Sequence, residues 1–168
     1  MNTSKRYSPE VRERAVRMVD ELGYDATVDR KSPEGIDAAI AAACPDGVDV
    51  YFDNVGGAAL EAAIANLAQG ARIVLCGSIT HYNAEEPLPG PSNLFELVTK
   101  EASMQGFMTH FRVDRYPEAR AQLGEWIDQG KLKNIEYMLE GIENAGVAFC
   151  DMFAGRNFGK AVVRISEE

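Results

Sequence analysis

Short apolar runs alternate with segments of helical periodicity through the first two thirds of the chain. Each run is four to eight residues long and is bounded by Asp, Gly or Pro, which is typical of buried parallel strands. The segments between them place apolar residues three and four positions apart, as in helices that pack on a sheet. The expected strands are Ala26–Asp29, Val48–Val55, Ala71–Leu75 and Ala102–Met108. The expected helices between them run from Ser32 to Ala43, from Ala58 to Ala68 and from Asn93 to Glu101.

This alternation predicts an α/β fold with a parallel sheet and right-handed crossovers. Further along the chain we expect an amphipathic helix over Pro117–Gln129, a strand over Glu136–Leu139, a helix over Glu143–Phe153 and a strand over Lys160–Ile165. At the amino terminus, Ser8 and Pro9 open a helix with an apolar stripe. The stripe consists of Val11, Ala15, Met18, Val19 and Leu22.

The glycines define which part of a dinucleotide-binding fold is present. No two of the 15 glycines stand two or three positions apart, so neither G-x-G-x-x-G nor A-x-x-G-x-x-G occurs in the sequence. We therefore expect a partial Rossmann-like parallel sheet that lacks its first two strands and the glycine-rich loop. In the usual strand order 3-2-1-4-5-6, this leaves the Val48–Val55 strand at an exposed edge.

Charge and composition narrow the classes of partner. The 168 residues carry a net charge of −9, which argues against general nucleic-acid binding. Residues 1–20 carry +2, however, which leaves −11 for the rest and places a compositional seam near Asp20. No apolar run approaches the ~20 residues of a membrane helix, and we expect a cytoplasmic protein. The three cysteines are far apart and suggest neither disulfides nor a zinc site.

The candidate ligand-binding and catalytic residues lie where the expected strands end. Ligands of open α/β sheets bind at the carboxyl ends of the strands. The three segments there are Asp53–Gly57, Cys76–Asn83 and Gly106–Met108. On pattern alone, an ordinary strand followed by a turn explains these residues equally well.

Four motifs in order give the chain a family resemblance. The strings FDNVGG, CGSITHYN, GFMTHF and GRNFGKAVVRI resemble the carboxyl-terminal half of zinc-independent medium-chain dehydrogenase/reductases, in the prostaglandin reductase and curcumin reductase branch. The similarity spans Glu21 to Ile165. It implies an NADP(H)-dependent oxidoreductase, an ene-reductase that delivers hydride to α,β-unsaturated ketones or aldehydes. It also implies a truncated chain, inactive alone, because the family's catalytic domain precedes the matched part.

The resemblance assigns roles to individual residues. Asn54 and the Cys76–Gly77 backbone would line the cofactor channel, Phe107 and Met108 would lie along the nicotinamide, and Asn157 would reach its carboxamide. Tyr82 matches a tyrosine near the nicotinamide ribose and the substrate carbonyl, and is the candidate catalytic residue. No metal ligand is implied. Arg30 stands where the family usually has tyrosine, and either a ribose-phosphate contact or a surface charge would explain it.

The first twenty residues resemble a different class of protein. Residues 1–20 are similar to the start of the helix-turn-helix protein of insertion-element transposases, without its recognition helix. The expected organisation is a transposase-like fusion helix over 1–20, a partial dinucleotide-binding domain over 21–130, and a segment over 131–168 that would pack on the absent catalytic domain. The alternative to an enzyme fragment is a non-catalytic gene-fusion remnant or association module. In the family that the chain resembles, the strand near Phe107 often mediates homodimers, so a homodimer is a possible assembly. The expected small-molecule partner is an enone or enal substrate. We expect binding neither to nucleic acid nor to a membrane.

Overall fold

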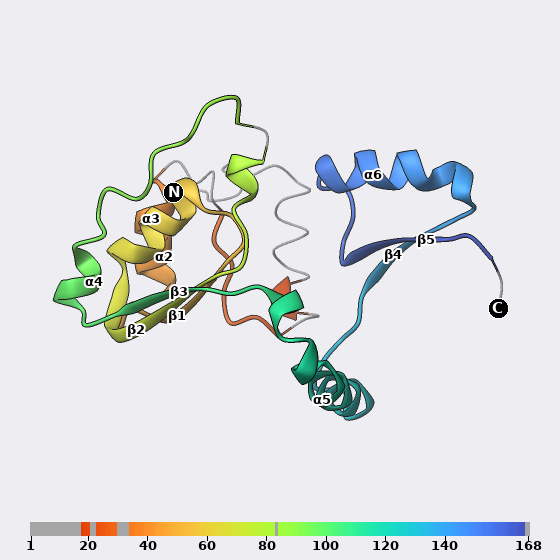
Figure 1. Ribbon diagram of the computed structural model, residues 1–168, viewed down its shortest axis with the longest axis horizontal. Coiled ribbons are helices and arrows are strands. Elements are labelled where there is room, and N and C mark those ends of the chain that lie inside the picture. The colour runs from red at the N-terminus through yellow and green to blue at the C-terminus, as the bar shows by residue number, and fades with distance from the viewer. Residues whose placement is uncertain (1–17, 21–22, 30–33, 83, 167–168) are drawn as a thin grey trace. The chain divides into compact units, whose positions relative to one another are not determined.

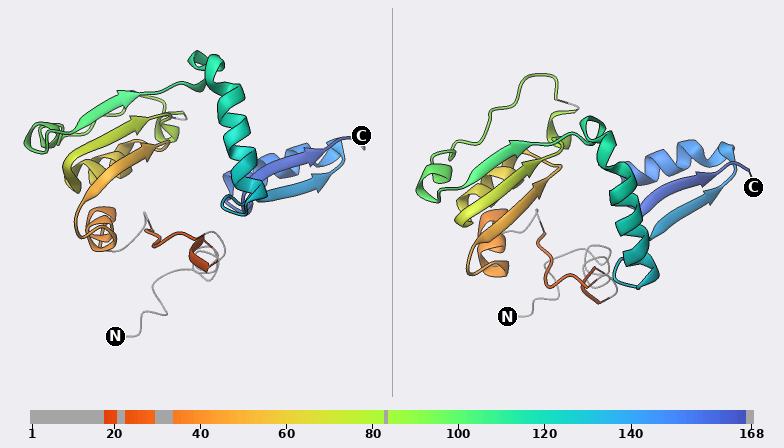
Figure 2. Two further views of the ribbon diagram at one scale, coloured as in Figure 1. Left: turned by 90° about the horizontal axis from the view of Figure 1, so that it is seen from below. Right: turned by 60° about the horizontal axis from the view of Figure 1, so that its bottom comes forward.

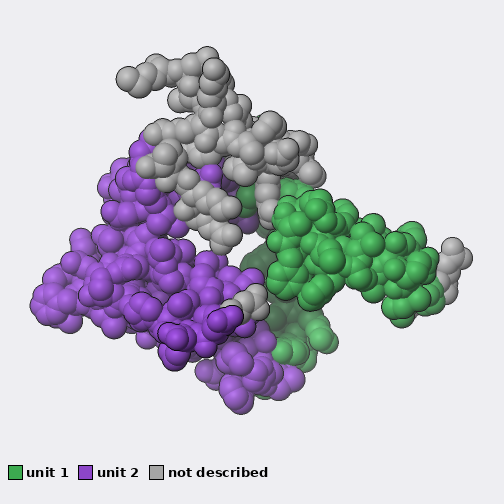
Figure 3. Space-filling model, turned by 90° about the horizontal axis from the view of Figure 1, so that it is seen from above, with its two compact units in different colours: residues 1–23, 114–168 green, residues 24–113 purple. Residues whose placement is uncertain are grey.

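The computed structural model describes residues 18–20, 23–29, 34–82 and 84–166 (Figure 1). The chain divides into two compact units (Figure 3). One unit holds residues 24–113, and the other holds residues 1–23 and 114–168. Most of the expected amino-terminal helix, including Val11 and Ala15, lies outside the described residues, as does Arg30. Of that helix the structure describes one helical stretch, residues 18–20.

The first unit is built on a three-stranded parallel sheet (Figure 2). Its strands are β1 (Val48–Asp53), β2 (Leu67–Leu75) and β3 (Ser103–Gly106), in the spatial order β1-β2-β3. Tyr51 pairs with Ile73, and Ile73 pairs with Met104. Within the described part of the chain β1 therefore has a strand neighbour on one side only, which confirms the predicted edge.

Two helices, α2 (Ile36–Ala43) and α3 (Gly57–Ala65), lie on one side of this sheet, as Figure 1 shows. The short α4 (Glu96–Thr99) lies beyond the end of the strands, just before β3. The core lies between α3 and β2, where Leu60 and Ile64 pack against Leu67, Ala71 and Ile73. Ile64 and Ile73 are almost completely buried. The helix stops at Asn66, whose side-chain amide donates to the Ala62 carbonyl at 2.9 Å, and β2 begins at the next residue.

The second unit contains a strand, a helix and a parallel strand. After α5 (Tyr116–Asp128), β4 (Glu136–Glu140) pairs in parallel with β5 (Lys160–Arg164), and α6 (Ala145–Phe153) forms the connection. Asp151 on α6 is buried and accepts two hydrogen bonds. Tyr137 Oη on β4 donates to it at 2.7 Å, and Arg156 Nε donates at 2.6 Å. This carboxylate therefore ties α6 to β4 and to the turn before β5.

The α/β fold class is confirmed, but one expected strand is absent and several element boundaries were wrong. The strand expected over Val48–Val55 ends at Asp53, because the N–H groups of Val55 and Gly56 bond to the Asp53 carboxylate in a turn. Residues 26–29 form no strand, since neither sheet of the described residues includes them and a strand needs a neighbouring ladder to stabilise it. The helix expected to end at Ala68 ends at Ala65, and β2 takes up the residues from Leu67. The helix expected over 93–101 shrinks to 96–99, because residues 92–95 form turns. The strand expected over 102–108 covers 103–106.

Candidate functional site

A cavity of about 650 Å³ opens at the carboxyl ends of the three parallel strands. The lining residues that the structure describes all belong to the first unit. They come from the loops after each strand, from the first turns of α3, and from the proline-bounded segment before α4. In order they are 53, 56–57, 60, 75–78, 81–82, 89–91, 106–108 and 111–112. The three segments that the sequence singled out thus each contribute residues to one site.

Asp53 organises the turn after β1. Its carboxylate accepts the backbone N–H groups of Val55 and Gly56, both at 3.0 Å, and the Tyr51 hydroxyl at 3.2 Å. The side chain is only 1% exposed. Gly56 has a φ of 70° and its missing side chain leaves room for Ser78, so a larger residue would collide with the next loop. Sequence reasoning gave Asp53 no role, although an acidic residue at the end of a buried strand was a usable signal.

This turn changes the acidity of Tyr51. Burial, together with the neighbouring Asp53 carboxylate and its hydrogen bond, raises the pKa of Tyr51 to about 12. Burial and the nearby carboxylate each disfavour a negative charge on the Tyr51 oxygen, and the hydrogen bond favours its protonated form. The Tyr51 hydroxyl therefore stays protonated and keeps donating to the carboxylate.

The loop after β2 brings several predicted residues together. The Asp53 carbonyl accepts the N–H of Cys76 at 2.8 Å and of Gly77 at 3.1 Å, which fixes the loop against the end of β1. A side chain on Gly77 would meet Tyr82 Oη at 3.2 Å and Asn54 Oδ1 at 3.3 Å. Tyr82 and Asn54 therefore both lie beside Gly77. Tyr82 is 70% exposed and lines the cavity, whereas Asn54 is not among the lining residues.

Two further residues of this loop, to which the sequence gave no individual role, lie in the cavity wall. Ser78 Oγ and His81 Nδ1 form a short hydrogen bond, and both side chains belong to the lining. Thr80 Oγ1 donates to the Val55 carbonyl at 2.8 Å and joins this loop to the β1 turn. The polar character of the CGSITHYN string was the available signal.

The third wall of the cavity follows β3. The Phe107 N–H donates to the Leu75 carbonyl at 2.8 Å, so the ladder continues past the strand and holds Phe107 beside β2. Phe107 and Met108, which the resemblance places along the nicotinamide, both line the cavity. Phe111 and Arg112 also belong to the lining. Among the lining residues that the structure describes, Arg112 is the one Lys or Arg, and its charge favours an anionic ligand.

Asn157 belongs to the other unit. Its side-chain amide donates to the Gly159 carbonyl at 2.9 Å, within the turn that leads into β5. Arg156, directly before it, is held by Asp151. The role of Asn157 toward a cofactor stays a prediction.

The residues of the first unit fit a dinucleotide better than a metal ion. The cavity volume falls in the range of about 300–1,000 Å³ that is usual for ligand sites, and the wall combines apolar side chains with backbone groups at strand ends. In the described part of the chain no group of three or more His, Cys, Asp or Glu is placed to hold a metal. The three cysteines are free thiols. No described helix has the length and apolar character that a membrane span requires.

Fold and cavity together define a parallel α/β unit of the kind that binds dinucleotides in oxidoreductases. The sequence profile of the family described as zinc-binding dehydrogenase matches residues 10–125. Since this match covers more than half of the chain, the protein belongs to that family of medium-chain dehydrogenase/reductases. The match begins inside the segment that resembles a transposase helix, and that second resemblance stays a prediction.

Relatives agree on the type of enzyme. The chain is 41% identical over 149 residues to YfmJ of Bacillus subtilis, a provisionally named NADP-dependent oxidoreductase, covering 88% of this chain and 44% of the relative. It is 36% identical to the NADP(+)-dependent 2-alkenal reductase of Nicotiana tabacum, covering 88% and 43%. A crystal structure of CurA from Vibrio vulnificus in complex with NADPH superposes with a TM-score of 0.82 at 37% identity, covering 93% and 48%.

Two of these relatives are named as NADP-dependent and the third was crystallised with NADPH, which agrees with the NADP(H) cofactor that the resemblance implies. The chain spans less than half the length of each of these relatives. The reactions that the full-length relatives catalyse are therefore only proposals for this chain.

Proposed function

We propose that this chain forms the cofactor-facing part of an NADPH-dependent reductase of α,β-unsaturated ketones and aldehydes. The observation that carries the proposal is the grouping of Cys76, Gly77, Tyr82, Phe107 and Met108 around one cavity at the ends of three parallel strands. The substrate class is supported by the names of relatives, among them the tobacco 2-alkenal reductase and a (+)-pulegone reductase of Mentha piperita, which is 37% identical.

The chain's own residues would orient the reactants. When bound, NADPH would supply the hydride that adds to one carbon of the double bond, and a proton from water would complete the reduction at the neighbouring carbon. Phe107 and Met108 would provide an apolar wall beside the nicotinamide, and the Cys76–Gly77 backbone would approach it. The Tyr82 hydroxyl would donate a hydrogen bond to the substrate carbonyl oxygen, on which negative charge develops as the double bond is reduced. Asn54, beside Gly77, and Asn157 complete the proposed cofactor contacts.

We also propose that the 168 residues alone bind NADPH weakly and do not turn over. The backbone N–H groups of a glycine-rich loop hold the pyrophosphate in dinucleotide-binding folds, and no such loop occurs in this sequence. In the proposed organisation, residues 21–130 serve the cofactor, residues 131–168 pack on a catalytic domain, and residues 1–20 are a fused helix. A non-catalytic association module is the second candidate, and the one-sided pairing of β1 favours it.

Cofactor binding is tested by titrating millimolar NADPH into the isotopically labelled chain and following backbone amide shifts by NMR. We expect shifts at residues 76–82 and 106–108, with a dissociation constant above about 100 μM, in the range of a few weak contacts. Phe107→Asp, which places a charge in the apolar cavity wall, should abolish these shifts. Val147→Asp is the matched control, because Val147 is an exposed apolar residue of α6, outside the cavity lining. Absent shifts, shifts elsewhere, or equal effects of the two variants would contradict the proposal.

A further inference from the structure

Arg112 enters the cavity wall on a short turn that directly follows Met108. This turn is the 3-10 segment η3 (Thr109–Phe111). The Arg112 N–H closes it by donating to the Thr109 carbonyl at 2.8 Å. Phe111 and Arg112 both belong to the cavity lining, as Met108 does. The apolar wall that follows β3 therefore ends in a guanidinium group.

The charge of Arg112 has no partner within the described part of the chain. Arg115, Arg156 and Arg164 each pair with a carboxylate, whereas neither an ion pair nor a side-chain hydrogen bond among the described residues reaches Arg112. Among the described lining residues Asp53 is the one carboxylate, and it is 1% exposed and bound by the N–H groups of its own turn. The cavity thus offers an unpaired cation that suits the negative charge of a ligand.

That negative charge could belong to a phosphate of the cofactor or to the substrate, and the place of Arg112 favours the substrate. Dinucleotide-binding folds hold the pyrophosphate at a glycine-rich turn between a strand and a helix. Arg112 instead follows β3 and the turn η3, on the wall that begins with Phe107 and Met108. In the proposed function those two residues lie beside the nicotinamide, which is the end of the cofactor that meets the substrate.

We propose that the cavity takes α,β-unsaturated ketones or aldehydes that also carry a carboxylate, and that Arg112 binds this carboxylate. The proposal rests on the proposed function, which places the substrate carbonyl at the Tyr82 hydroxyl. Tyr82 and Arg112 come from the loops after two neighbouring strands and line the same cavity. A guanidinium presents paired N–H donors that match the two oxygens of a carboxylate. Holding the substrate at both ends would orient its double bond.

The charge of the whole chain makes this preference depend on Arg112. The chain carries a net charge of −9, so its long-range field disfavours anions. A carboxylate also loses part of its hydration when it enters a cavity, which a methyl group in its place does not. Without the Arg112 cation, a neutral ketone should therefore bind better than its carboxylate analogue.

Two saturated ketones of similar size test the proposal. In 3-benzoylpropionate a ketone and a carboxylate are joined by a short chain, and butyrophenone has a methyl group in place of the carboxylate. Neither has an activated double bond that could add to the free cysteines. Dissociation constants are measured by NMR from the backbone amide shifts of residues 106–112 in the labelled 168-residue chain. We expect 3-benzoylpropionate to bind at least about threefold more tightly than butyrophenone.

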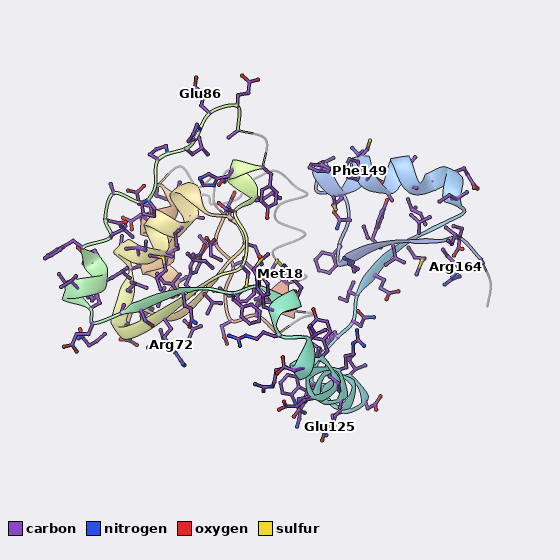
Figure 4. The ribbon with its side chains drawn as sticks, viewed as in Figure 1. Met18, Arg72, Glu86, Glu125, Phe149 and Arg164 are labelled. Atoms are coloured by element: carbon purple, nitrogen blue, oxygen red, sulfur yellow. The ribbon has the colours of Figure 1, made fainter. Side chains whose placement is uncertain are left out.

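Three variants locate the source of this preference. Arg112→Gln should reverse it, so that butyrophenone binds more tightly. Arg112→Lys keeps a charge without the paired donors and should keep a weaker preference for the carboxylate. Arg72→Gln is the matched control, because Arg72 is an exposed arginine of the same unit outside the lining, and Figure 4 shows it projecting from the side of the sheet opposite α3. It should change neither dissociation constant by more than about twofold.

NADPH titration of Arg112→Gln separates the cofactor from the substrate as the source of the anion. We expect the NADPH-induced shifts to be unchanged, and weaker NADPH binding would show that Arg112 holds a cofactor phosphate and would overturn the proposal. Equal affinities for the two ketones, no shifts with either, or a carboxylate preference kept in folded Arg112→Gln would also overturn it and leave the cofactor assignment intact. A preference that depends on Arg112 without any NADPH shift would support the anion site and contradict the reductase function.

Discussion

Asp53 holds the turn after β1 together, and its removal should destabilise the first unit. Asp53→Ala leaves the N–H groups of half-buried Val55 and buried Gly56 without their acceptor. Hydrogen bonds to charged groups contribute about 1.5–3 kcal/mol, and we expect a loss of this size in urea unfolding. Asp49→Ala on the same strand is the control, since Asp49 is exposed and should change stability by less than about 0.5 kcal/mol. Equal losses in the two variants would show that the turn does not need the carboxylate.

Tyr51 should give the protein a measurable sensitivity to alkali. Its pKa is about 12 in the fold and 10.0 in its ordinary state, so the unfolded chain loses the proton first. The contribution of Tyr51 to stability is therefore complete below pH 10 and is lost as the pH rises toward 12. Tyr51→Phe should reduce the fall in unfolding free energy over this interval, measured by urea unfolding at each pH. An unchanged slope would mean that the hydroxyl is not bound to Asp53.

Asp151 should have the opposite pH dependence in the second unit. Hydrogen bonds from Tyr137 and from Arg156 lower its pKa below the ordinary 3.8. The stabilisation is thus present above pH 3.8 and is lost as the pH falls through the lower value in the folded state. Asp151→Asn should raise the pH of acid unfolding, followed by circular dichroism. Glu140→Gln removes the exposed ion pair with Arg164 and should have a smaller effect.

The helices and strands show what the sequence could predict. The strands at Val48, Ile73 and Gln105 were found because each combines an apolar run with a turn, and their parallel pairing followed from the intervening helices. Residues 26–29 have the same local pattern, yet form no strand, because a strand exists only with a neighbour that supplies its ladder. The Asp53 carboxylate was missed for a related reason, since its partners are backbone amides that no side-chain motif reports. The parallel pairing of β4 with β5 was also not predicted, because the sequence pattern gives each strand but not its partner.

The helix at residues 18–20 gives a prediction for the amino-terminal segment. Met18 is half-buried there, while Val19 is more exposed. Full burial of such a side chain contributes about 1.5–3 kcal/mol, so Met18→Asp should cost about 1 kcal/mol or more in thermal or urea unfolding. Val19→Asp on the same helix should cost less. If Met18→Asp leaves stability unchanged, the segment is an appendage and does not pack on the fold.

For the whole chain, the decisive question is whether the cavity can catalyse a reaction without further protein around it. Hydride transfer needs the nicotinamide held in a fixed position and shielded from water. The cavity offers Tyr82, Phe107 and Met108, but Tyr82 is largely exposed and the sequence has no glycine-rich loop for the pyrophosphate. We therefore expect no NADPH oxidation, followed by absorbance, when micromolar protein meets an enone such as 3-nonen-2-one. Turnover that is lost in Tyr82→Phe and kept in Tyr24→Phe, at an exposed tyrosine outside the cavity lining, would instead show that the 168 residues hold a complete reductase site.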